Sequence, residues 1–280
     1  MAVNQTDDGQ TQRRRRGSAK DGRRAREDWK NGPALHDSIK DIAAGYDAGM
    51  MRVAGLILLF TLSAFGQRWE SLFDGKSLDG WRVEAKAVDK AKGFWKAANG
   101  AIECDSLGRK QHNYVWLINE REFGDFELRL KVMGFKESPG NSGVQVRSRW
   151  DASMEWLNGP QVDIHPPAPW RTGLIYDETR ETRRWIYPSL KDSQIAPEQG
   201  PKQWKWNAED WNDILITCNG GHIKTVVNGF TITDADLGAV LNDEAHQKRN
   251  AGMKGHIALQ LHANDELRIR YKDIQVRELR

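Results

Sequence analysis

Five short segments of the chain alternate polar and apolar residues with the period of a β-strand. In the clearest one, residues 256–262, the apolar side chains fall on one side of an extended chain, while Gln260 and His262 fall on the other. The pattern is weakest in residues 214–218, where Thr217 is the one polar side chain. Alternation of this kind predicts strands with one buried face. The five segments are residues 141–147, 161–165, 214–218, 222–227 and 256–262.

Turn signals separate these and further strand-like segments. We expect a hairpin around Asn99-Gly100, because this dipeptide favours a two-residue turn, and a short helix only within residues 234–249. Many short strands joined by glycine-rich turns predict an all-β fold, a jelly-roll sandwich of antiparallel sheets. Residues 166–210 form a long irregular stretch with six prolines, and a loop of that length is usually functional or a lid.

The N-terminal part differs in composition from the rest. Residues 1–50 show little apolar periodicity, and we expect them to be disordered or to precede the true translation start at Met51. Residues 51–66 have the layout of a signal peptide: one Arg, a short apolar run, and small residues at Ala64 and Gly66. The sequence thus predicts a secreted or periplasmic domain spanning residues 67–280, with no stable membrane insertion after cleavage.

Charge and cysteine content exclude several function classes. The whole chain holds 42 Lys and Arg against 39 Asp and Glu, and the excess lies before residue 67. The folded part is therefore formally neutral and gives no electrostatic reason to expect nucleic acid as a partner. Cys104 and Cys218 are too few for a thiolate metal site or a disulfide framework. We expect buried thiols and leave a single bridge open.

The polar faces of the predicted strands carry the candidate site. A sheet face with Arg, Asp, His and Gln above an apolar layer suits a hydroxyl-rich ligand, although such a face can also simply meet water. Abundant Trp offers stacking surfaces for sugar rings, with core packing as the plainer interpretation. The expected substrate-binding residues are Asn141, Gln145, Arg147, Gln161, Tyr176, Asp177, Glu178 and Gln260, and the expected catalytic residues are Asp163, His165 and His262.

Eight short motifs, in this order, are together specific for one family. They are residues 72–81, 123–128, 141–147, 159–164, 176–178, 211–212, 228–229 and 255–262. From about Trp69 to the C-terminus the chain resembles the 3-keto-disaccharide hydrolase domain family. The resemblance implies a concanavalin A-like jelly roll with a concave ligand face. It also implies an exported enzyme that cleaves glycosides whose glucose ring carries a ketone at carbon 3.

The residues depart from the pattern of ordinary glucanases of similar fold. Retaining glycosidases need two carboxylates about 5–5.5 Å apart, which some such glucanases carry on one strand as Glu-x-Asp-x-x-Glu. Here Gln161 and Pro166 stand where the two glutamates would be, on either side of Asp163. We therefore do not expect double displacement on an unmodified glycan.

A 3-keto sugar offers another route, because its ketone acidifies the hydrogen on carbon 2. A base removes this proton, the aglycone leaves carbon 1, and water adds, which gives net hydrolysis. We expect His165 or His262 as the base, with Asp163 orienting an imidazole and Arg147 or a divalent metal holding the enolate oxygen. Asp163, His165 and His262 would be suitable ligands for Zn²⁺, Mn²⁺ or Ca²⁺.

Two other functions remain open from sequence. A non-catalytic carbohydrate-binding module could use the same concave face without a base or metal. A structural or adhesion domain would instead expose a large apolar patch.

Overall fold

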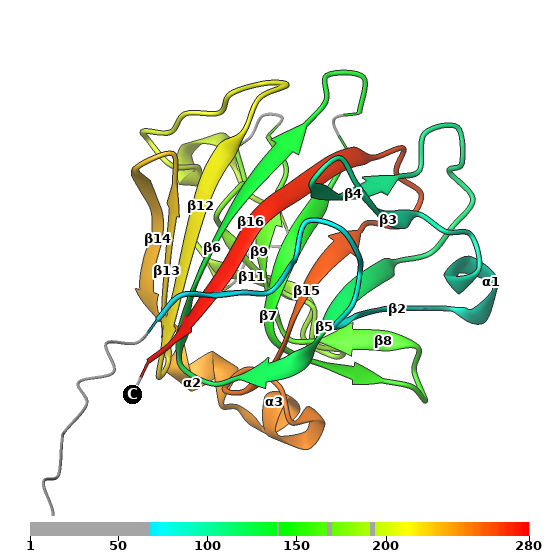
Figure 1. Ribbon diagram of the computed structural model, residues 1–280. Coiled ribbons are helices and arrows are strands. Elements are labelled where there is room, and N and C mark those ends of the chain that lie inside the picture. The colour runs from blue at the N-terminus through cyan, green and yellow to red at the C-terminus, as the bar shows by residue number, and fades with distance from the viewer. Residues whose placement is uncertain (1–67, 139, 167–169, 191–193, 280) are drawn as a thin grey trace, which may run out of the picture. The chain divides into compact units, whose positions relative to one another are not determined.

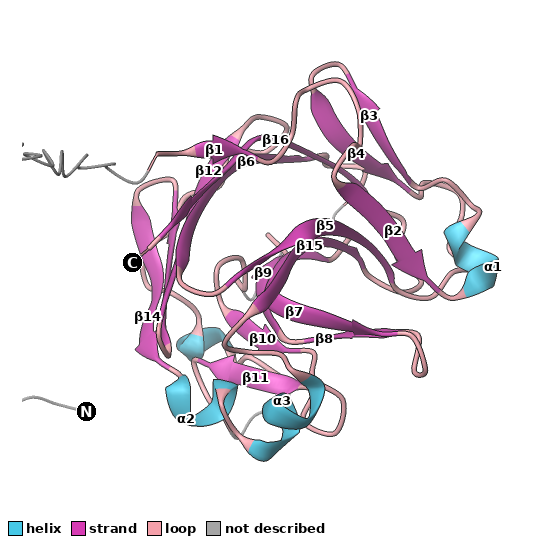
Figure 2. Cartoon of the chain, turned by 60° about the horizontal axis from the view of Figure 1, so that its bottom comes forward, coloured by secondary structure: helices cyan, strands magenta, loops and turns pink. Residues whose placement is uncertain are grey.

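The computed structural model describes residues 68–138, 140–166, 170–190 and 194–279, and these form two antiparallel sheets packed face to face (Figures 1 and 2). The predicted N-terminal extension and signal peptide lie outside the described residues. In sheet A the strands run in the order β14 (Phe230–Asp236), β13 (His222–Val227), β12 (Asn212–Asn219), β6 (Phe126–Gly134), β16 (Arg268–Glu278), β4 (Ala101–Asp105) and β3 (Trp95–Ala98), and β1 (Glu70–Ser71) also pairs with β16.

Sheet B carries the predicted polar residues. Its strands run in the order β11 (Arg184–Tyr187), β10 (Ile175–Asp177), β9 (Pro160–Ile164), β7 (Ser142–Asp151), β15 (Gly255–Leu261), β5 (Val115–Phe123) and β2 (Trp81–Ala85), and β8 (Trp156–Asn158) pairs with β7. All five segments picked out by alternation are strands, which confirms the all-β jelly-roll sandwich. Two short strands, β10 and β11, lie within the stretch expected to be irregular.

The predicted hairpin turn is present, and the helices match the sequence expectation in part. Asn99 and Gly100 both have positive φ, at 50° and 73°, and join β3 to β4 as the predicted hairpin. The region expected to be helical, residues 234–249, begins with the end of β14 and continues with two short helices, α2 (Gly238–Leu241) and α3 (Glu244–Arg249). The structure also contains a short helix, α1 (Ala87–Lys90), and a 3₁₀ turn, η1 (Pro197–Gln199), which the sequence did not predict. None of the described helices is long and apolar enough to cross a membrane.

The core lies between the sheets because each strand turns its apolar face inward. On β9, Val162 and Ile164 are buried in this core, while Gln161 and Asp163 point to the opposite face, which we call the outer face of sheet B. Burying each such aliphatic side chain stabilises the fold by about 1.5–3 kcal/mol. This burial fixes the strand register and, with it, the direction of the polar side chains.

The outer face of sheet B does not simply meet water. A second apolar cluster covers part of it, made of Trp116, Ile118, Trp156, Leu157 and Ala258. Beside this cluster Gln145 and Gln260 are fully buried. Buried amide groups need hydrogen-bond partners, so this part of the face is an enclosed polar site and not a solvent-exposed surface.

The sequence left open whether the two cysteines form a disulfide bond, and in the structure they do not. Cys104 on β4 and Cys218 on β12 are both buried and free. Burial raises the pKa of both thiols, so neither is a reactive thiolate.

Candidate active site

A polar pocket of about 170 Å³ opens on the outer face of sheet B. Strands β9, β10 and β11 contribute to its wall, together with residues just outside the ends of β5, β7 and β15. The residues that line it are Tyr114, Asn141, Gln161, Asp163, Arg171, Tyr176, Glu178, Arg183, Trp185 and His262. Six of these were predicted from sequence, and alternation along the strands is what brings them together.

Asp163 is a buried carboxyl whose charge is poorly satisfied. Its Oδ1 accepts a weak hydrogen bond from Gln161 Nε2 at 3.4 Å, and Arg171 Nε lies 3.7 Å from its Oδ2. Among the described residues nothing donates a hydrogen bond to Oδ2. Burial raises the pKa of Asp163 to about 7, although the charges of Arg171 and His262 oppose this. The group is therefore poised to exchange a proton near neutral pH.

Glu178 is a second buried carboxyl in the same pocket. Its Oε1 accepts a hydrogen bond from Gln260 Nε2 at 3.1 Å, and Arg183 Nε lies 3.5 Å from its Oε2. Burial raises the pKa of Glu178, against the opposing effects of Arg183 and Gln260. Oε2 has no hydrogen-bond donor within the described part of the chain, so each carboxyl keeps one oxygen unpartnered.

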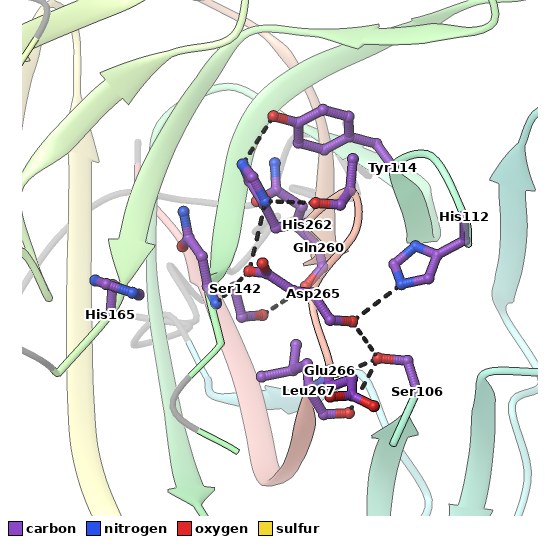
Figure 3. A network of polar contacts seen from close by, with 12 residues as sticks. Ser106, His112, Tyr114, Ser142, His165, Gln260, His262, Asp265, Glu266 and Leu267 are labelled. Atoms are coloured by element: carbon purple, nitrogen blue, oxygen red, sulfur yellow. Dashed lines mark hydrogen bonds and ion pairs between the residues drawn. The ribbon is translucent and has the colours of Figure 1, made fainter. Parts of the chain in front are cut away.

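His262 is the centre of a hydrogen-bonded group at the end of β15 (Figure 3). Its Nε2 lies 2.9 Å from the Tyr114 hydroxyl, and its Nδ1 lies 3.1 Å from Ala263 O and 3.5 Å from Asp265 Oδ2. Burial opposes a charge on the ring, but Asp265 and then Glu178 outweigh it and raise the pKa of His262.

Asp265, which contacts the His262 ring, is itself held in place by several hydrogen bonds. The backbone N–H of Asn141 donates to its Oδ2 at 2.8 Å, and its carbonyl oxygen accepts from Ser106 Oγ at 2.7 Å and contacts His112 Nε2 at 3.0 Å (Figure 3). Burial opposes the charge of the Asp265 carboxylate, but the hydrogen bonds from His262 and from the Asn141 N–H, together with the His262 charge, outweigh it and hold the pKa of Asp265 below its ordinary value. Asp265, not Asp163, therefore orients an imidazole.

His165 lies apart from this group (Figure 3). Its Nδ1 faces the guanidinium of Arg171, and burial together with that positive charge lowers its pKa to about 4. The predicted metal set of Asp163, His165 and His262 is not assembled: across the described ranges no three His, Cys, Asp or Glu side chains gather closely enough to hold a metal ion. The residues do not fit a metal site, and no step is assigned to one.

Arg147 was expected to share a face with Gln145, and this was wrong. Its φ is +50°, which places a β-bulge in β7 and breaks the alternation. Its fully buried guanidinium donates to Gly124 O and Gly220 O, both at 2.6 Å, and pairs with Asp125 at 2.8 Å. It joins turns at the ends of strands and does not line the pocket.

Three other predicted residues, Gln145, Asp177 and Gln260, support the pocket from outside it, and Gln260 does so through its hydrogen bond to Glu178. Gln145 is buried next to the pocket and donates to Leu157 O at 3.4 Å. Asp177 pairs with His246 Nε2 at 3.2 Å, and both side chains are fully buried. Thr182 Oγ1 also donates to Asp177 at 2.7 Å, so this carboxylate fixes the turn between β10 and β11 that carries Glu178 and Arg183.

Comparison with known proteins decides the family. The family model described as the 3-keto-alpha-glucoside-1,2-lyase-like domain matches residues 68–277, three quarters of the chain. The chain belongs to this family. Membership confirms the resemblance carried by the sequence motifs and places this lyase-like domain among domains that act on carbohydrates.

Solved structures resemble the domain at low sequence identity. A candidate glycosyl hydrolase from Parabacteroides distasonis is 15% identical with a TM-score of 0.49, and the match covers 76% of this chain and 94% of that one. A Bacillus subtilis protein with a galectin-like fold is 12% identical with a TM-score of 0.48, covering 72% and 90%. A Bacillus subtilis carbohydrate binding module is 11% identical with a TM-score of 0.43, covering 71% and 96%. No curated protein matches the chain.

Four pocket residues of the lyase-like domain were not predicted: Tyr114, Arg171, Arg183 and Trp185. Arg183 lies over the rings of Trp156, at 4.7 Å, and of Tyr114, at 5.8 Å. Trp185 meets Tyr176 edge to face, with ring centroids 5.2 Å apart. The pocket thus combines two guanidinium groups, two carboxyls and aromatic walls, a composition that suits a ring with many hydroxyl groups.

Proposed function

We propose that this domain cleaves glycosides whose glucose ring carries a ketone at carbon 3. The reaction is an elimination across carbons 1 and 2 followed by addition of water, with net hydrolysis. Family membership supports this reaction, since the family is described as 3-keto-alpha-glucoside-1,2-lyase-like. The observation that carries the proposal is Asp163, a buried carboxyl with an unpartnered oxygen and a pKa of about 7.

Asp163 takes the proton from carbon 2. Its raised pKa makes the carboxylate a stronger base than an ordinary aspartate, while a substantial fraction stays ionised at neutral pH. The electron pair of the C–H bond moves toward carbon 3 and places negative charge on the ketone oxygen. Arg171, whose Nε is 3.7 Å from Asp163, is the guanidinium best placed to stabilise that enolate oxygen.

The enolate then expels the aglycone from carbon 1. Asp163 exchanges its proton with solvent, water adds to carbon 1 of the resulting unsaturated ketone, and Asp163 then gives a solvent-derived proton to carbon 2. No covalent bond to the enzyme is needed, which agrees with Gln161 standing where a retaining glucanase would carry a carboxylate.

A second candidate function follows from the two carboxyls in one pocket. Asp163 and Glu178 could act as the acid and base pair of an ordinary glycosidase on an unmodified glycan. This reaction needs no ketone, so the two candidates differ in substrate. A binding module would cleave neither substrate.

The test compares a 3-keto-glucoside with its parent glucoside, using the full chain. We expect cleavage of the keto substrate alone, and a loss of about 10²–10⁴-fold in kcat for Asp163→Asn. Asp234→Asn, at a half-exposed carboxylate on sheet A, is the matched control and should keep full activity. Equal cleavage of the parent glucoside supports the ordinary glycosidase, and binding without cleavage of either supports a carbohydrate-binding module.

A further inference from the structure

The Tyr114 hydroxyl stands at the pocket end of a chain of hydrogen-bonding groups. The chain runs from Asp265 through both ring nitrogens of His262 to Tyr114, over contacts of 3.5 Å and 2.9 Å. His262 Nδ1 faces two acceptors, the Asp265 carboxylate and Ala263 O, so this nitrogen carries a proton. His262 Nε2 then either accepts from the phenol or donates to it.

These two states differ in what Tyr114 offers the pocket. When His262 is neutral, the phenol O–H donates to Nε2. When His262 is a cation, Nε2–H donates to the phenol oxygen, and the phenol proton is free to turn toward a ligand in the pocket. Arg183 Nη2 lies 3.3 Å from the same phenol oxygen and would stabilise a transient tyrosinate.

Tyr114 is also held in a fixed orientation. Its ring stacks on Trp116 with centroids 5.5 Å apart and meets Trp156 edge to face at 4.9 Å. Burial and the negative charge of Glu178 raise the pKa of Tyr114 to about 12, which keeps the phenol protonated in the resting enzyme. A fixed, protonated hydroxyl backed by an imidazole is suited to donate a proton.

We propose that Tyr114 is the general acid that protonates the departing glycosidic oxygen, with His262 as the group that restores its proton. This inference rests on the proposed function. As the bond between carbon 1 and the glycosidic oxygen breaks, the oxygen keeps the bonding pair and takes the Tyr114 proton. The Nε2 proton of His262 passes to the phenolate, and His262 becomes neutral.

The water that later adds to carbon 1 releases the proton that recharges His262. The two substrate proton transfers of the elimination step are then assigned to separate groups: Asp163 removes the carbon 2 proton, and Tyr114 donates a proton to the leaving group. Asp265 acts through His262 and is a positioning residue. Both Tyr114 and His262 line the pocket, so the phenol can reach a ligand there.

The dependence of kcat on the leaving group, measured with the full chain, tests whether Tyr114 is the general acid. An acid is essential for a poor leaving group such as methanol and nearly dispensable for a good one such as 4-nitrophenol. We expect Tyr114→Phe to lose about 10²–10⁴-fold in kcat on the methyl 3-keto-glucoside. On the 4-nitrophenyl 3-keto-glucoside the same variant should retain kcat to within a factor of ten. His262→Gln, which can donate to the phenol oxygen but cannot pass on a proton, should follow the same pattern.

Two comparison variants make the result decisive. Asp163→Asn should reduce turnover of both substrates alike, because carbon 2 is deprotonated in each. Tyr176→Phe removes another hydroxyl that lines the pocket but takes no part in the contacts between Asp265, His262 and Tyr114. This variant should lose similar activity on both substrates, whatever the leaving group. Equal losses on both substrates for Tyr114→Phe would overturn the general-acid role. If the wild type cleaves neither 3-keto-glucoside, the proposed function itself fails.

Discussion

Asp163→Asn should stabilise the protein at the same time as it removes activity. The wild-type carboxyl has a pKa of about 7 in the folded state against an ordinary value of 3.8. The folded state therefore binds this proton more tightly than the unfolded state, and stability falls as pH rises between those values. Below pH 3.8 both states are protonated and the group has no effect, while above pH 7 the full cost is present.

The magnitude follows from the shift. Moving a carboxyl pKa from 3.8 to about 7 corresponds to about 4 kcal/mol in the free energy of unfolding, since each pKa unit is about 1.4 kcal/mol. Asn cannot ionise, so the variant escapes this cost. We expect Asp163→Asn to be more stable than wild type by up to about 4 kcal/mol at pH 8, with the difference shrinking toward pH 4.

Urea unfolding of both proteins from pH 4 to pH 8 measures this difference. Asp177→Asn is the matched control, because Asp177 is equally buried but its bonds to His246 and Thr182 lower its pKa against the effect of burial. That variant should be less stable than wild type at neutral pH, the opposite sign. A stability difference for Asp163→Asn that stays constant with pH, or favours wild type at pH 8, would refute the reasoning.

Three further predictions concern groups outside the pocket. Arg147→Met should lower the free energy of unfolding by about 3–5 kcal/mol in urea, because Asp125 and two carbonyls lose their buried partner, while kcat of the folded variant stays near wild type. His246 has a pKa raised above its ordinary 6.5, since two carboxylates outweigh its burial, so the stability advantage of wild type over His246→Gln should be full below pH 6.5 and fade as pH rises. Cys104 and Cys218 should react with a thiol reagent only after unfolding, and a reductant should leave the melting temperature unchanged.

Strand alternation was sufficient to place much of the site. Gln161 and Asp163 on β9, and Gln260 and His262 at β15, lie on one face because the inward residues between them are anchored in the core. The same logic failed at Arg147, since it assumes unbroken extended backbone and a residue with φ of +50° reverses the side-chain direction. Nothing in the local pattern of β7 signals that bulge.

Residues outside the regular strands could not be placed from periodicity. Arg171 and Arg183 lie in turns of the long proline-rich stretch, and their positions depend on the pairing of β10 with β9 and of β11 with β10. Asp265 follows the end of β15, and its role depends on contacts with segments more than a hundred residues away, such as Asn141. The length of the stretch from residue 166 to residue 210 was the sequence signal that it contributes to a functional site.

Proton removal from carbon 2 is the central claim, and reaction in D₂O tests it most directly. A 3-keto-glucoside is incubated with the full chain, and the released sugar is examined by NMR against an enzyme-free control. Elimination followed by addition of water predicts one deuterium at carbon 2 of the released 3-keto sugar. Release of a sugar that retains its original hydrogen at carbon 2 would contradict the account, because direct displacement at carbon 1 leaves that bond intact.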